Sequence, residues 1–175
     1  MLKITAIIII LAVVIILILA AIRPDSFRVE RSINIKAPPE KIFPLIIDFH
    51  HMNTWSAWEK IDPAMKRSYS GAESGKGAMY AWDGNKEIGQ GSMEILEATP
   101  SSKVLIKIDF YKPFEAHNSV EFTLLPHGET TTVTHAMYGP SPYIAKLMSL
   151  VFSMDKMVSS KFEEGFASLK AAAEK

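Results

Sequence analysis

The side chains best suited to acid–base chemistry near neutral pH are the five histidines, His50, His51, His117, His127 and His135. His50 and His51 are adjacent, so their side chains diverge, and no HExxH helix is present. The sequence has no cysteine, which excludes disulfides, thiolate nucleophiles and cysteine-bound metals. We therefore expect neither a metal site nor a cofactor. The first four histidines are expected to be exposed or at loop ends.

His135 is the histidine that the sequence places inside the protein. In the segment Thr130 to Tyr138, residues alternate so that Val133, His135 and Met137 share one face of a strand, opposite the threonines. An inward histidine has two roles open to it. The more ordinary role is a neutral core histidine satisfied by one hydrogen bond, and the other is a proton donor to a ligand carbonyl.

Nucleophilic catalysis has little support in the sequence. Serines are frequent between Ser68 and Ser74, but they form no nucleophile-elbow motif. No Ser/His/Asp set can be named from the spacing either. An enzyme is therefore a weaker expectation than a binding protein.

A set of large apolar side chains, with two polar ones on inward parity, indicates a ligand cavity. Core packing alone explains each of these residues individually, and only their number, beside Arg67 and His135, favours a cavity. The candidate lining residues are Trp55, Trp58, Arg67, Tyr69, Tyr80, Trp82, Met93, Ile108, Phe110, His135, Met137, Met157 and Phe162.

A long amphipathic helix near the C-terminus is the element around which the rest must pack. Apolar residues recur there at steps of three and four, at Leu147, Leu150, Val151, Met154, Met157, Val158, Phe162, Gly165, Phe166 and Leu169. Lysines, glutamates and serines fall mainly on the other side. One face must be buried, and the preceding segments supply strands rather than helices. Residues 144–153 are either a separate segment or the opening turns of this helix.

Strands separated by turn-forming clusters account for most of the remaining chain. A strand from Phe27 to Ile35 precedes two short helices between Ala37 and Trp58. The first is expected to end near Asp48, and Pro44 within it either shortens it to little more than a turn or kinks it. Further strands are predicted at residues 65–69, 78–82, 88–98, 104–111, 116–125 and 130–138. Gly89 and Gly91 leave one face of a strand bare, which suits either the close approach of another backbone or a bend in the sheet, and we favour the bend. We predict an α+β fold, with a curved antiparallel sheet of about six to seven strands around one long helix.

The N-terminus carries an uninterrupted apolar run. Ile4 to Ile22 contains 19 residues with Thr5 as the only polar member, enough at helical rise to cover a hydrocarbon core of roughly 30 Å. A cleaved signal peptide is the alternative, but the run is longer than a typical apolar region and lacks a good cleavage site. We predict a transmembrane anchor at residues 1–23 and one domain at residues 24–175. Basic residues flank both ends of the run, so the side of the membrane stays open.

Charge is balanced, with 19 basic and 19 acidic residues. This composition carries no electrostatic footprint for nucleic acid. We therefore expect no nucleic-acid partner.

Four segments together resemble the START-like (SRPBCC) superfamily of polyketide cyclases and dehydrases, lipid-transfer domains and pathogenesis-related plant proteins. They are Ile35 to Phe43, Asp48 to Trp58, Gly77 to Gly84, and Ile88 to Met93, and the resemblance covers residues 27–173. It implies a helix-grip fold, as in START and Bet v 1-like proteins. It also implies a deep apolar cavity between sheet and helix that binds a hydrophobic ligand.

Three functions follow from the anchor and this resemblance. The first is a membrane-anchored carrier or sensor of a hydrophobic small molecule or lipid. The second is a cyclase- or dehydratase-like enzyme with His135 and Tyr80 as acid–base groups. The third is a protein-binding module like the cochaperone relatives of the fold, which would use its surface rather than its cavity.

Overall fold

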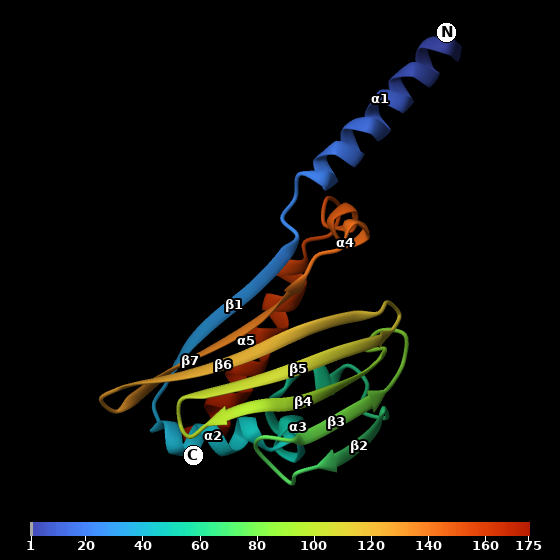
Figure 1. The fold of residues 1–175 in the computed structure, drawn as a ribbon. Coiled ribbons are helices and arrows are strands. Elements are labelled where there is room, and N and C mark those ends of the chain that lie inside the picture. Colours follow the sequence, from blue (N-terminus) through green and yellow to red (C-terminus); the bar gives the residue numbers. More distant parts are fainter. Residues whose placement is uncertain (1) are drawn as a thin grey trace.

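The computed structural model describes residues 2–175, so Met1 of the predicted anchor lies outside the described residues. Helix α1 projects away from a domain made of one curved sheet and one long helix (Figure 1). In chain order the elements are α1 (Leu2–Ala21), β1 (Ser26–Ile35), α2 (Pro39–Ile47), η1 (Phe49–His51), α3 (Met52–Trp55), η2 (Ala57–Lys60), β2 (Lys66–Gly71), β3 (Ala78–Asp83), β4 (Gln90–Thr99), β5 (Lys103–Lys112), β6 (Ala116–His127), β7 (Thr130–Pro140), α4 (Tyr143–Met148) and α5 (Met154–Ala173).

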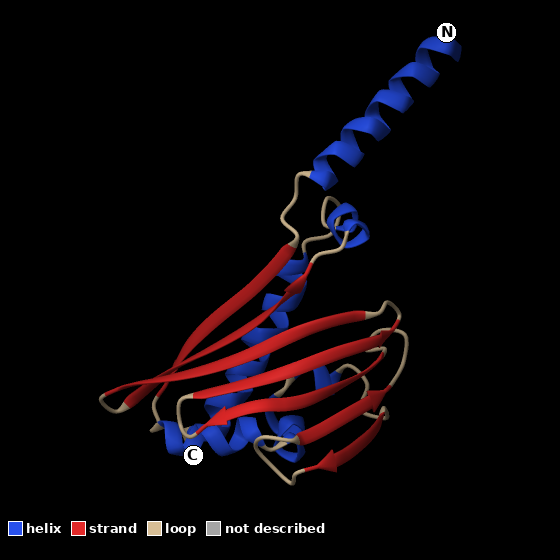
Figure 2. Ribbon diagram, viewed as in Figure 1, coloured by secondary structure: helices blue, strands red, loops and turns tan. Residues whose placement is uncertain are grey.

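The seven strands form one antiparallel sheet in the order β1-β7-β6-β5-β4-β3-β2. Strands β2 to β7 are a meander in which each strand pairs with the next, and Figure 2 shows these strands in red. Strand β1 forms the edge opposite β2 and pairs with β7, from Ser26 opposite Pro140 to Ile35 opposite Thr131. The predicted α+β fold with a curved antiparallel sheet is confirmed.

Helix α5 lies against the concave face of the sheet and closes the core. Its inward stripe is Val158, Phe162, Phe166 and Leu169, all buried, and the spacing of four, four and three residues keeps them on one face. The side chain of Ser153 accepts a hydrogen bond from the backbone N–H of Lys156 and so caps the start of the helix. This arrangement is the predicted helix-grip.

The structure resolves where the C-terminal helix begins. Residues 143–148 form the separate helix α4, which ends where the backbone N–H groups of Ser149 and Phe152 bond to Ala145 and Met148. The apolar stripe of α5 therefore starts later than predicted, because residues 143–148 form a separate helix and residues 149–152 form turns and a bend between the two. Val151 and Met157 are exposed, while the side chain of Met154 lies outside what the structure describes.

The short helix α2 ends at Ile47, with Asp48 as its C-cap, as predicted, and Pro44 does not shorten it. Pro38 and Pro39 start it, since proline is tolerated in a first turn whose N–H groups have no helical partner. Its buried side, with Ile42, Phe43 and Ile46, packs on the core. Burial of this face outweighs the hydrogen bond that Pro44 cannot donate.

Candidate functional site

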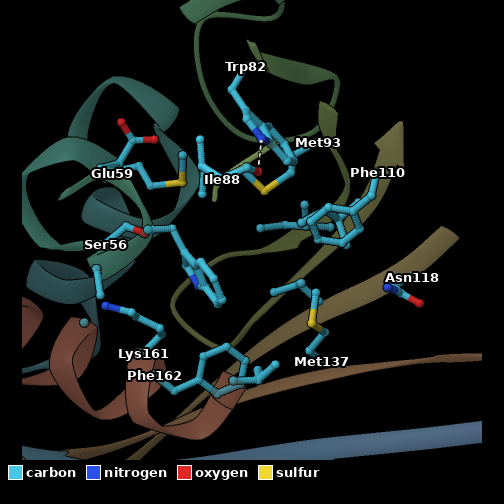
Figure 3. Close-up of a pocket in the computed structure, with 18 of the residues that line it drawn as sticks. Ser56, Glu59, Trp82, Ile88, Met93, Phe110, Asn118, Met137, Lys161 and Phe162 are labelled. Carbon is cyan, nitrogen blue, oxygen red and sulfur yellow. Dashed lines mark hydrogen bonds between the residues drawn. The ribbon is translucent and has the colours of Figure 1, made fainter. Parts of the chain in front are cut away.

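A cavity of about 370 Å³ lies between the concave face of the sheet, α5 and the short helical segments before β2. Its wall is mostly aliphatic and aromatic (Figure 3). In this view Ser56 and Glu59 lie on one side and Asn118 on the opposite side, with Met137 and Phe162 between them. An apolar cavity with a few polar groups is the usual form of a small-molecule site.

The structure brings most of the candidate residues together around this cavity. Those that line it are Trp55, Trp58, Tyr80, Trp82, Met93, Ile108, Phe110, His135, Met137, Met157 and Phe162. They come from α3, η2, α5 and four strands, so they share no sequence pattern beyond strand parity and helical spacing. Their contact with a ligand stays a prediction.

The other two candidates, Arg67 and Tyr69, are not among the lining residues. Both belong to β2, the edge strand, where inward parity does not ensure a place on the cavity wall. The Tyr69 ring stacks on His50, with ring centroids 4.1 Å apart, and remains partly exposed. The Arg67 guanidinium instead bonds to Glu59 and to the backbone oxygens of Pro63 and Met65.

A buried carboxylate, which the sequence did not reveal, stands at the edge of the cavity. Glu59 is buried and lines the cavity, and one of its oxygens accepts from Arg67 Nε at 2.7 Å. Its other oxygen accepts from the Tyr80 hydroxyl at 2.6 Å. A glutamate in a short 3-10 helix would ordinarily be exposed. Its burial is possible because β2 and β3 bring Arg67 and Tyr80 close enough to hydrogen-bond to the carboxylate.

Burial and this carboxylate together keep Tyr80 protonated. Burial and the neighbouring Glu59 both raise the pKa of the Tyr80 phenol, so it stays protonated at physiological pH. Its proton is already donated to Glu59. A role for Tyr80 as a general acid therefore gains nothing from the geometry.

His135 is held between aromatic rings. Its ring stacks on Phe122 and Phe162, with centroid distances of 4.1 Å and 3.6 Å, and meets Phe166 edge-on at 6.2 Å. Burial lowers the pKa of His135 to about 3, so the imidazole is neutral near pH 7. The inward orientation predicted from strand parity is thus what the structure shows.

The hydrogen bond expected for a core histidine is not found among the described residues. None of them hydrogen-bonds to the ring nitrogens of His135, which corrects the expectation of a satisfied core histidine. Among the described residues, no buried side-chain nitrogen or oxygen is both sealed off and unpaired. The ring nitrogens of His135 therefore reach the cavity that the residue lines. A neutral imidazole there can donate from one nitrogen and accept at the other.

Gly91 shapes the wall beside Trp82. A Cβ atom at Gly91 would lie 2.4 Å from the Trp82 ring and 2.5 Å from the backbone oxygen of Asp109. The Trp82 indole occupies the space that a side chain at Gly91 would need. Its Nε1 donates a hydrogen bond to the backbone oxygen of Ile88 at 3.3 Å. The β4–β5 register also shifts between Gln90 and Gly91, in agreement with the predicted bend.

The remaining histidines lie away from the cavity. His50 and His51 contact the carboxylate of Asp48, and His117 contacts that of Asp109, all with about half or more of the histidine side chain exposed. Within residues 2–175, no three His, Asp or Glu side chains are grouped so as to hold a metal ion.

A curved antiparallel sheet that grips one helix around an apolar cavity defines the helix-grip class of Bet v 1-like proteins. Within this class, the chain belongs to the family described as "Polyketide cyclase / dehydrase and lipid transport", whose model matches residues 26–174. Fold and family together support a domain that binds hydrophobic ligands. A search of the curated proteins gives no match.

Solved structures of several proteins share the fold at low sequence identity. Protein CV1439 from Chromobacterium violaceum is 14% identical with a TM-score of 0.59, over 87% of this chain and 99% of that one. The Aha1 dimer from Colwellia psychrerythraea is 18% identical with a TM-score of 0.56, over 85% and 96% of the two chains. Ara h 8.0201 is 12% identical with a TM-score of 0.56, over 85% and 97%.

Outside the matched region lies one helix of the described residues that is long and apolar enough to cross a membrane. It spans Lys3–Ala21, and almost none of it is buried against the rest of the protein. Length and composition of this kind are shared by membrane anchors and signal sequences.

Proposed function

We propose that this protein is a membrane-anchored binding or carrier protein for a hydrophobic small molecule or lipid. The observation that carries the proposal is the cavity of about 370 Å³ between sheet and α5, whose wall is almost entirely apolar. A volume in this range is typical of small-molecule sites, and a solid core would leave no such space. The family match and the fold support the same function.

The chemistry of the wall specifies the ligand further. Most of the ligand must be apolar, because it contacts aromatic and aliphatic side chains such as Trp55, Ile108 and Phe110. One polar group of the ligand meets His135, whose neutral ring nitrogens have no protein partner within the described chain. A neutral imidazole offers hydrogen bonds but no ion pair, so an uncharged hydroxyl or carbonyl suits it. An acidic group of the ligand would instead pair with Lys112 or Lys161, which also line the cavity.

Anchoring by residues 1–23 accounts for the exposed apolar surface of α1. Its isoleucine, leucine and valine side chains face away from the domain at residues 24–175, and a lipid bilayer is the environment that would cover them. A tether of this kind would keep the cavity close to a supply of hydrophobic ligand. The side of the membrane on which the domain lies stays open.

Native mass spectrometry of the full chain, extracted from its own membrane in mild detergent, tests the binding function. We expect a co-purifying apolar molecule. In Ile108→Trp, a larger side chain fills the cavity and the bound mass should be lost, because Ile108 lines the wall. Leu125→Trp is the matched control, since Leu125 is exposed on β6 and is not a lining residue.

An empty wild-type protein would contradict the proposal. So would a bound mass that is retained equally in Ile108→Trp and Leu125→Trp, because the molecule would then lie outside the cavity.

A further inference from the structure

The segment of residues 143–152, here called the α4 segment, leaves an unusual amount of apolar surface exposed. Ile144, Val151 and Phe152 are 63%, 78% and 67% exposed. Met148 and Tyr143 are also among the exposed large side chains. Exposed apolar residues are ordinary when scattered singly, but a cluster in one short segment marks a surface that contacts a partner or a membrane.

The α4 segment is tied to the end of α1. The Tyr143 hydroxyl donates to the backbone oxygen of Leu17 at 2.9 Å, and α4 contacts α1. The Lys146 ammonium pairs with the carboxylate of Asp25 in the connection to β1. Ala20 is fully buried, although nearly all of α1 around it is exposed. The polar groups of the segment are thus directed to α1 and its connection, and its apolar side chains face outward.

These contacts place the segment at a definite depth if α1 spans a bilayer. The 19 residues of Lys3–Ala21 rise about 28 Å, close to the roughly 30 Å of a hydrocarbon core, so the whole helix is needed to cross it. Leu17 precedes the helix end by four residues, or about 6 Å. Tyr143, bonded to Leu17, then lies at the boundary between acyl chains and headgroups, where tyrosine is enriched in membrane proteins.

We propose that the α4 segment is a membrane-binding element that inserts Ile144, Val151 and Phe152 into the surface of the bilayer that α1 crosses. This inference rests on the anchoring stated above and adds a second membrane contact to it. The lipid surface is the occupant because a helix with an apolar face and a neighbouring cation suits the interface. Arg23 supplies that cation, lining a shallow surface hollow with residues 149–153 and Asp155.

The cavity reaches the same end of the domain. Phe27, in the second position of β1, and Met157, in the first turn of α5, both line it. The first residues of β1 and α5 lie next to α4 and the end of α1 (Figure 1). A ligand leaving the cavity at this end would enter the bilayer without crossing water. The proposed insertion would therefore bring this end of the cavity close to lipid.

The absence of native cysteines allows a direct test in the full chain. Val151→Cys is labelled with the fluorophore NBD and reconstituted in phosphatidylcholine nanodiscs, with and without doxyl-labelled phosphatidylcholine. Insertion by about 5–10 Å brings the label beside the doxyl groups, so we expect a loss of emission. Leu125→Cys is the matched control, because Leu125 is 58% exposed yet lies at the opposite end of the sheet in β6. Ile10→Cys, in the middle of α1, reports the anchor itself.

Quenching at Val151 and Ile10, but not at Leu125, supports the proposal. Quenching at Ile10 alone would overturn it and leave the anchor in place. Absence of quenching at Ile10 would remove both the anchor and the membrane contact of the α4 segment. None of these outcomes alters the mass-spectrometric test of the cavity, so the two proposals can fail separately.

Discussion

Replacing His135 with phenylalanine should remove a large part of the protein's sensitivity to acid. Phenylalanine has a similar shape and can keep the stacking on Phe122 and Phe162, while it has no group to protonate. In the folded protein, burial lowers the pKa of His135 to about 3, against 6.5 for an exposed histidine. Between these two values the unfolded chain binds a proton that the folded chain does not.

The sign and size of the effect follow from this difference. Stability is unaffected by His135 above about pH 6.5, falls as the pH drops below that value, and stops falling only near the native pKa. Between pH 7.5 and pH 5 the loss is about 2 kcal/mol, and any native pKa at or below about 4 gives nearly the same figure. His135→Phe should lack this component and should be at least as stable as wild type at pH 7.5.

Urea unfolding of the full chain in detergent, followed by tryptophan fluorescence at pH 7.5 and pH 5, measures the difference. Val133→Ala is the control, because Val133 is fully buried on the same strand and does not titrate. It should lower stability by the same amount at both pH values. If wild type and His135→Phe lost equal stability on acidification, His135 would not be held neutral by burial. Its ring nitrogens would then not be the neutral hydrogen-bonding groups inferred for the cavity.

Three further predictions concern packing. Phe162→Ala should lower the free energy of unfolding by about 3–5 kcal/mol in urea titration, because Phe162 is buried against the sheet. Lys161→Ala should have little effect. Similar urea midpoints for the two variants would show that α5 is not central to the core. Deleting residues 1–23 should give a domain that is soluble and melts cooperatively, since α1 adds almost nothing to the core; a molten product by near-ultraviolet circular dichroism would show that the division is wrong. Gly91→Ala should lower the melting temperature, because the new Cβ would overlap the Trp82 ring. An unchanged melting temperature would mean that the ring moves aside without loss of stability.

The candidate site was predictable only where burial follows from a local pattern. Strand parity in β7 was enough to direct His135 inward, and helical spacing was enough for Phe162. Parity in β2 was not enough for Arg67, because an edge strand has a neighbour on one side only and the space in front of it is filled by Glu59. The burial of Glu59 itself depends on Arg67 and Tyr80, which are 8 and 21 residues away in the sequence.

The sequence by itself determined the layers of this protein, because periodicities of two and of 3.6 residues are local properties of the chain. They indicated the strands, the gripping helix and the apolar helix before the domain. Tertiary structure alone decided which polar atoms find partners, since this depends on residues brought together from distant parts of the chain. It left the nitrogens of His135 open to the cavity, buried Glu59, separated α4 from α5, and joined Tyr143 to Leu17 across more than a hundred residues. The helix-grip could therefore be derived from local patterns, whereas the polar chemistry of the cavity and the contact of α4 with the end of α1 required the folded chain.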